Sequence, residues 1–276
     1  MITVNALIAV LAAVGSALVL AVGTVLQHQA GHGPQELTLR RMWLHPLWVL
    51  GAVAGLLAVG LHIVALDHGA LSVVQPLLVS GLLFALPLNS VLEHRPIHLA
   101  DTVAAGAVVL GLATFQLTAR PSPGQAVAQL PALAWSTGLT LILVAGGVGA
   151  AIRRPSDRAS WLGLATGAAY GLMAALLKST VGAFSEHGAA VLTTWPLYAF
   201  VVIGAGAIML NQIAYNAGPL ALSLPLITIV DPVVAVAIGA IAFHETISSH
   251  PPAIAGQVAG FAVMCTGIIA LSRRAD

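Results

Sequence analysis

Long apolar runs separated by short polar stretches dominate the chain. Each run has about the twenty residues that an α-helix needs to cross the hydrocarbon core of a bilayer. The short alternating segments of a membrane β-barrel do not occur. The pattern therefore predicts an all-α, polytopic membrane protein of about nine transmembrane helices. The predicted spans are roughly 3–26, 46–66, 70–91, 97–118, 132–151, 160–183, 194–215, 218–243 and 252–272.

Composition supports this assignment and excludes several classes of protein. The chain is 59% hydrophobic and 7% charged, whereas a soluble domain is about 25% charged. The single Cys265 excludes an internal disulfide and a multi-cysteine metal site. No phosphate-binding loop or G-x-S-x-G element occurs. We expect the lipid bilayer as a partner, and neither a cofactor nor nucleic acid.

The loop charges predict the orientation in the membrane. With the N-terminus outside, eight arginines lie in inner segments and only Arg120 lies in an outer loop. Positive residues favour the cytoplasmic side, so this split predicts an external N-terminus, a cytoplasmic C-terminus and a location in the plasma membrane. The inner set is Arg40, Arg41, Arg95, Arg153, Arg154, Arg158, Arg273 and Arg274.

Short segments recur along the chain at an offset near 150 residues. The recurrence places four spans in residues 1–130, four in 153–276, and a linking span in 131–152. Because the second copy starts five spans after the first, it is inverted across the membrane, a common plan of secondary transporters. The matched segments are His45–Trp48 with Trp195–Tyr198, Ala65–Leu71 with Ala214–Leu220, Pro76 with Pro225, and Glu93 with Glu245.

Small residues at helical spacing predict close helix packing. One stripe continues to Lys178 and another to His62, so both ionisable side chains are expected to face the bundle interior. Exposed glycine faces could also serve a homodimer. The stripes are Gly163, Gly167 and Gly171; Gly51, Gly55 and Ala58; and Gly256 and Gly260.

The span 218–243 contains Asp231 near its middle and is interrupted by Pro225 and Pro232. A proline has no N–H, so the two should free the carbonyls of Ala221 and Thr228. We interpret these prolines, and Pro76 in the first repeat, as helix breaks. A carboxylate at membrane depth is a functional candidate by default. The alternative is a kinked packing helix with a buried, neutral Asp231.

Other polar residues inside the spans complete the predicted substrate or ion site. Asp231 would bind and release a proton if it is unpaired, and would stay ionised beside Lys178 or a cation. Lys178 could pair with Asp231 or extend to the outer interface. The set is Asp231, Thr228, Lys178, Asn211, Gln212, His62 and Gln75.

Ten histidines suggest metal binding only superficially. The i, i+4 pairs His28/His32 and His94/His98 lie in or near inner loops, without cysteine or paired carboxylates. We therefore expect no metal at these histidines, and Asp231 is the one metal candidate.

A run into a proline, a helix that ends in glutamate and then a glycine-rich span occur twice, at 77–111 and 231–267. This layout resembles the EamA-type units of the drug/metabolite transporter superfamily over nearly the whole chain. Within it, Pro46–Trp48, Ala70–Leu77 and Leu210–Gln212 with Tyr215 are similar to the NIPA-type magnesium transporter group, which is expected to have nine spans.

The chain departs from the NIPA pattern at two points. Gln27–Gln29 replaces a basic run, and Leu61 replaces an acidic residue after Gly60. Losing a carboxylate weakens the case for magnesium, because Mg²⁺ is usually held by one or two carboxylates.

The sequence favours a secondary transporter that moves a small solute by alternating access. A transporter of Mg²⁺ or another divalent cation is the first alternative, and a non-transporting membrane scaffold is the second. An intramembrane enzyme is not favoured, because no nucleophile–base pair is visible.

Overall fold

The computed structural model describes residues 4–31, 45–81, 83–84, 87–88, 98–122, 124–218 and 220–272. These residues are helical or form short connections, and no strand occurs among them. Two short 3-10 helices, η1 (Pro155–Asp157) and η2 (Gly188–Thr193), flank α8. The α-helices are α1 (Val4–Gly31), α3 (Pro46–His68), α4 (Leu71–Leu78), α6 (Leu99–Ala119), α7 (Leu130–Arg153), α8 (Arg158–His187), α9 (Trp195–Asn216), α10 (Leu220–Ala242) and α11 (Pro251–Ser272).

Eight of the helices in the described ranges are long and apolar enough to cross a bilayer. They coincide within a few residues with eight predicted spans. The remaining span, 70–91, is described only in part, and α4 covers its beginning. The chain is thus an all-helical, multi-pass membrane protein, whereas its division into 1–130, 131–152 and 153–276 stays a prediction.

Large aliphatic and aromatic side chains cover the outside of the bundle, and small residues fill its inside. Leu56, Val202 and Trp135 are 74%, 71% and 81% exposed, while Ala65 and Ala175 are fully buried. Lipid is as apolar as leucine, so burying leucine between helices gains little and close backbone packing contributes more. The central helix of the bundle is α8, whose residues are mostly buried.

The glycine stripe of α8 packs directly on α10. A Cβ on Gly163 would meet Ser223, and a Cβ on Gly167 would lie 2.8 Å from the Ile227 carbonyl oxygen. A Cβ on Gly171 would lie 2.6 Å from the Asp231 carbonyl oxygen. The positions pair in the same order along both helices, so α8 and α10 run parallel. This confirms the packing role predicted for the stripe.

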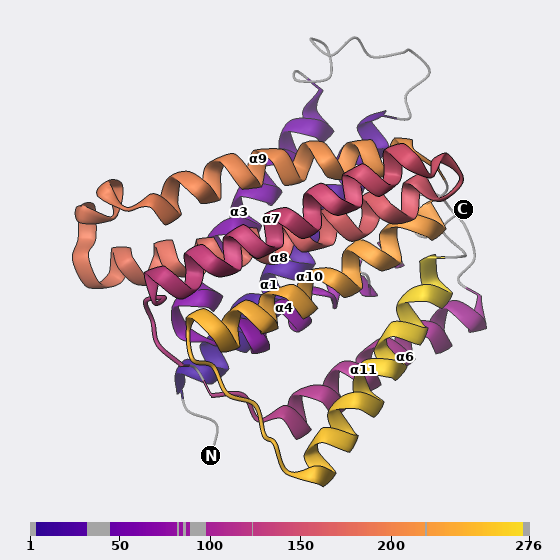
Figure 1. Ribbon diagram of the computed structural model, residues 1–276. Coiled ribbons are helices and arrows are strands. Elements are labelled where there is room, and N and C mark those ends of the chain that lie inside the picture. Colours follow the sequence, from indigo (N-terminus) through magenta and orange to yellow (C-terminus); the bar gives the residue numbers. More distant parts are fainter. Residues whose placement is uncertain are drawn as a thin grey trace.

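Helices α6 and α11 form a close pair that Figure 1 shows to one side of the other helices. Glycines bring the two backbones together: a Cβ on Gly111 would lie 2.5 Å from the Gly260 carbonyl oxygen, and Gly267 abuts Ala104. An apolar groove of about 300 Å³ lies between this pair and helices α4 and α10. Its walls include Pro76, Phe115, Pro232, Val236, Val258 and Phe261.

Prolines interrupt the helices less than predicted. The helix α10 is continuous from Leu220 to Ala242 and contains both Pro225 and Pro232, so the predicted breaks at these two residues are wrong. A proline removes a single helical hydrogen bond, and close packing on α8 supports this helix on both sides of that gap. In contrast, α4 ends at Leu78, two residues after Pro76, and helical residues resume at Gly81.

A side chain from α6 compensates for Pro76. Pro76 cannot donate to the carbonyl of Ser72, four residues earlier. The amide Nε2 of Gln116 donates to the carbonyl oxygens of Val73 at 3.0 Å and Ser72 at 3.5 Å. A polar side chain between helices thus replaces a main-chain donor, as backbone in lipid requires.

Four connections gather at one end of the bundle, where α1 also begins (Figure 1). They are residues 69–70, 120–129, 188–194 and 243–250, and we call this the Glu245 end. The helix α11 ends at the opposite end (Figure 1). The arrangement agrees with the alternating path expected for an odd number of spans.

Two of these connections are hydrogen-bonded to each other. The N–H of Ser122 donates to the Thr246 carbonyl at 2.9 Å, and the N–H of Gln125 donates to the Phe243 carbonyl at 2.7 Å. Gly124 has φ +62, and a Cβ there would lie 2.3 Å from the Phe243 oxygen, so only glycine fits. Further bonds join Gln129 N–H to Ala242 O at 2.9 Å and Ser248 N–H to Ala119 O at 2.7 Å.

Candidate functional site

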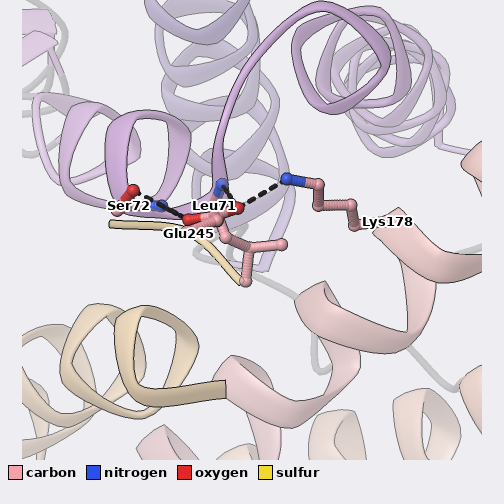
Figure 2. Close-up of polar contacts among 4 residues, drawn as sticks. All are labelled: Leu71, Ser72, Lys178 and Glu245. Atoms are coloured by element: carbon pink, nitrogen blue, oxygen red, sulfur yellow. Dashed lines mark hydrogen bonds and ion pairs between the residues drawn. The ribbon is translucent and has the colours of Figure 1, made fainter. Parts of the chain in front are cut away.

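The Glu245 side chain collects four donors from two helices (Figure 2). Its Oε1 accepts from the Lys178 ammonium at 2.5 Å and from the Leu71 N–H at 2.7 Å. Its Oε2 accepts from the N–H of Ser72 at 3.0 Å and from the Ser72 hydroxyl at 2.8 Å. Glu245 follows α10, Lys178 belongs to α8, and Leu71 and Ser72 open α4. We call these four residues the latch.

The latch satisfies the N-terminus of α4 from outside that helix. Ala70 is the N-cap and has no side-chain hydrogen bond to give. The first N–H groups of a helix carry partial positive charge and need acceptors. Glu245 supplies a carboxylate there from 174 residues away, so the start of α4 depends on a distant part of the chain.

The latch is sealed from solvent. Lys178 is 3% exposed and Glu245 is 4% exposed. The ammonium of Lys178 also lies 4.9 Å from the ring centroid of Phe243, which is fully buried. Charges are tolerated in such surroundings only when they are paired and hydrogen-bonded, and both conditions are met here.

The position of Lys178 corrects one expectation and confirms another. As predicted from its stripe, the side chain points into the bundle. It neither extends to the outer interface nor pairs with Asp231, because Glu245 takes the ammonium. Gly171, seven residues earlier, lies opposite Asp231, so Lys178 stands about 10 Å further along the helix at 1.5 Å per residue.

Asp231 has one carboxylate oxygen inside the bundle that no described residue bonds. Its Oδ1 is buried and has no hydrogen bond to any described residue. Seven described side chains have such an atom, and Asp231 is the one carboxylate among them. A buried anionic oxygen without a donor is costly, so Asp231 is suited to bind a proton or a cation.

Three further polar residues, Tyr170, Asn211 and Tyr215, belong to the two helices that contact α10 beside Asp231. Tyr170 of α8 directly precedes Gly171, which packs against the Asp231 main chain. Asn211, one turn before Tyr215 on α9, bonds to the Tyr215 side chain and keeps a buried Oδ1 without a partner. Helices α9 and α10 thus each carry a buried oxygen without a donor, at Asn211 and Asp231. We call these two residues with Tyr170 and Tyr215 the Asp231 region.

The remaining predicted residues are divided between other places. His62 of α3 and Gln75 of α4 meet at 3.4 Å between Nε2 atoms. The Thr228 hydroxyl donates to the Leu224 carbonyl of its own helix at 2.8 Å. Gln212 is exposed, unlike its neighbour Asn211. The predicted set is therefore divided. His62 and Gln75 form a pair, Asp231 and Asn211 belong to the Asp231 region, Lys178 belongs to the latch, Thr228 bonds within α10, and Gln212 lies on the outside.

No group of three or more His, Cys, Asp or Glu in the described part of the chain could hold a metal ion. His32 and His94 of the histidine pairs lie outside the described residues, as do Glu93 and the arginines at 40, 41, 95, 273 and 274. The prediction that Asp231 binds a metal stays a prediction.

Sequence reasoning singled out Lys178 but not its partner. Glu245 was visible as a helix-ending glutamate that repeats Glu93. That repetition was a usable signal. The missing information was which helix ends meet, and only the folded chain brings Glu245 to Leu71 and Lys178.

Comparison with known proteins identifies a relative that extends over almost the same length. The uncharacterized protein Cgl0250/cg0304 of Corynebacterium glutamicum is 32% identical over 277 residues, covering 97% of this chain and 95% of that protein. No family model matches the chain, and no solved structure matches it. Because the similarity covers nearly all of both proteins, this chain belongs to the same family as the Corynebacterium glutamicum protein.

Proposed function

We propose that the protein is a secondary transporter of the drug/metabolite superfamily that moves a small solute by alternating access. It is not an enzyme in this proposal. Its halves, 1–130 and 153–276, are inverted repeats in the plasma membrane, with the N-terminus outside and the C-terminus in the cytoplasm. The apolar helices support the membrane setting, and the unpaired Asp231 supports transport.

Asp231 is the main support for a transport function, because no described residue donates a hydrogen bond to its Oδ1 or pairs with it. In a scaffold, a mid-membrane carboxylate would be expected to be sealed and bonded. Here Oδ1 is buried without a donor, and the ammonium two turns away is already bound to Glu245. Intramembrane carboxylates of this kind mark ion pathways and proton relays. The ion that Asp231 binds is therefore positive.

Helix contacts support the repeat. In the proposed scheme α1, α3, α4 and α6 correspond to α8, α9, α10 and α11. Contacts between α1 and α3 match those between α8 and α9, and contacts between α1 and α4 match those between α8 and α10. Equivalent helices also touch, α4 with α10 and α6 with α11. Such contacts are expected about a pseudo-two-fold axis in the membrane plane.

Transport in proteoliposomes tests the proposal. Purified wild type, Asp231→Asn and the exposed-carboxylate control Glu186→Gln are reconstituted and given a pH gradient. Mg²⁺ and a panel of small metabolites are the probes. We expect solute flux that follows the pH gradient in wild type and in the control, and loss of that coupling in Asp231→Asn. Full gradient-driven flux in Asp231→Asn would contradict the role of Asp231.

The same experiment separates the alternatives. If wild type transports Mg²⁺ and Asp231→Asn does not, the protein is a divalent-cation transporter instead of a small-solute transporter, and Asp231 remains part of its site. Flux of no probe in wild type would favour the membrane scaffold.

A further inference from the structure

The latch is the point where the helices of the Glu245 end are tied together. Glu245 follows α10 and binds α8 through Lys178 and α4 through Leu71 and Ser72. The segment 120–129, between α6 and α7, is bonded to residues 242–248 around it. Six of the described helices, α4, α6, α7, α8, α10 and α11, therefore meet through one carboxylate and the connection that carries it.

We propose that the latch is the gate at the Glu245 end of the transport path, and that this end opens when Glu245 leaves Lys178 and the start of α4. The inference rests on the proposed transport function. It concerns a different part of the chain from Asp231.

The apolar residues beneath the latch show that the gate is shut in this structure. Val74, Leu172 and Leu176 are fully buried and pack with Leu71 and Phe243 in one cluster. This cluster lies between the latch and the level of Gly171, which faces Asp231. A solute or ion approaching from this end meets the bonded carboxylate first and the apolar plug next.

The position of Glu245 in the chain suits a reversible contact. It lies in the non-helical connection 243–250, after His244 with φ 53, so its side chain can rotate away while α10 and the main-chain hydrogen bonds of this connection stay in place. The groups that it leaves are polar and can be hydrated. An ion pair is strong in a dry, low-dielectric site and weak in water, so entry of water at this end would favour release and sealing would favour closure.

Labelling of a cysteine below the latch tests the gate without any substrate. Val74→Cys, in a Cys265→Ser background, places a small thiol among the buried residues under Leu71. A membrane-impermeant maleimide is added outside intact cells, because the proposed orientation places the Glu245 end on the outer side. The latch is then varied with Glu245→Gln, which removes the charge, and Ser72→Ala, which removes one neutral donor. Glu186→Gln is the matched control on the same side.

We expect slow labelling in the parent and in Glu186→Gln, and labelling about tenfold faster or more in Glu245→Gln, because a lost charge-assisted hydrogen bond shifts a two-state equilibrium by about that factor. Ser72→Ala should give a smaller increase. Equal rates in all four proteins would overturn the gate.

A second reporter distinguishes opening from unfolding. Val108→Cys lies fully buried in the α6–α11 pair, so it should stay unlabelled when only the gate opens. Faster labelling of both reporters in Glu245→Gln and in Ser72→Ala would mean general loosening and would also overturn the proposal. Solute flux in proteoliposomes together with unchanged Val74→Cys labelling would refute the gate alone. Faster labelling of Val74→Cys alone, without flux of any probe, would support an end that opens at the latch and would count against the proposed transport function.

Discussion

The Lys178 ammonium and the Glu245 carboxylate lie 2.5 Å apart, 67 residues apart in the chain and almost completely buried. Each neutralises the other. The pair joins the connection after α10 to the interior of α8 instead of offering a charge to a solute. As a result Asp231, about two turns away along the bundle, is left without Lys178 as a counter-charge.

Removal of either partner should destabilise the protein, and removal of both should cost less than the sum. Lys178→Met and Glu245→Gln each leave one buried group without its counter-charge, so each should lower the free energy of unfolding by about 3–5 kcal/mol. In the double variant no unpaired charge remains. Thermal unfolding in detergent, completed as a double-mutant cycle, measures the difference. Strictly additive losses would contradict a coupled pair, and Glu186→Gln should unfold like wild type.

A small carboxylate should repair the Glu245→Ala variant. The substitution leaves the Lys178 ammonium, two N–H groups and the Ser72 hydroxyl around a space shaped for a carboxylate. Formate should therefore raise the unfolding temperature of Glu245→Ala in a saturable way, since a ligand that binds only the folded state stabilises it. Chloride at equal ionic strength is the control. An identical response to both salts would show that the space does not bind carboxylates.

Glycine substitutions should have opposite signs on two helices. A Cβ at Gly171 would lie 2.6 Å from the Asp231 carbonyl oxygen, so Gly171→Ala should cost about 1–3 kcal/mol through overpacking. Gly146 on α7 has no neighbour within 4 Å of such an atom, so Gly146→Ala should instead stabilise by about 0.5–1 kcal/mol through helix propensity. Unfolding temperatures in detergent compare the two. Equal effects would contradict the close α8–α10 contact.

Gln116 and Pro76 should be energetically coupled. Gln116→Leu removes the donor to the carbonyls of Ser72 and Val73 and should cost about 1–3 kcal/mol, the usual penalty for leaving a buried acceptor unsatisfied. Pro76→Ala restores a main-chain N–H to α4. In that background Gln116→Leu should therefore cost clearly less. A double-mutant cycle on unfolding temperatures measures the coupling, and equal costs in both backgrounds would refute it.

Asp231→Asn should separate stability from function. Because Oδ1 makes no hydrogen bond among the described residues, the neutral amide should fold at least as stably as the carboxylate. We expect this variant to lose function, because functional sites often contain groups that lower stability but are needed for activity. The unfolding temperature should be unchanged or raised while gradient-driven flux is lost. A marked drop in unfolding temperature would indicate that the carboxylate has a structural partner.

The sequence by itself determined the helices and much of the packing. Apolar runs longer than about eighteen residues can satisfy their backbone in lipid only as helices, so eight spans were predicted within a few residues. The Gly163–Gly171 stripe was also readable, because its three members face one side of a helix and leave room for a backbone. The inward position of Lys178 followed from the same helical spacing.

Only the tertiary structure decided the pairing of charges. The helix-ending Glu245 is visible in the sequence, but its partners come from α4 and α8, and the choice depends on which helix ends share one side of the bundle. The continuity of α10 through Pro225 and Pro232 was likewise undecided by local rules. A proline removes one hydrogen bond, and whether the helix then breaks depends on the neighbour packed against it, which here is the glycine face of α8.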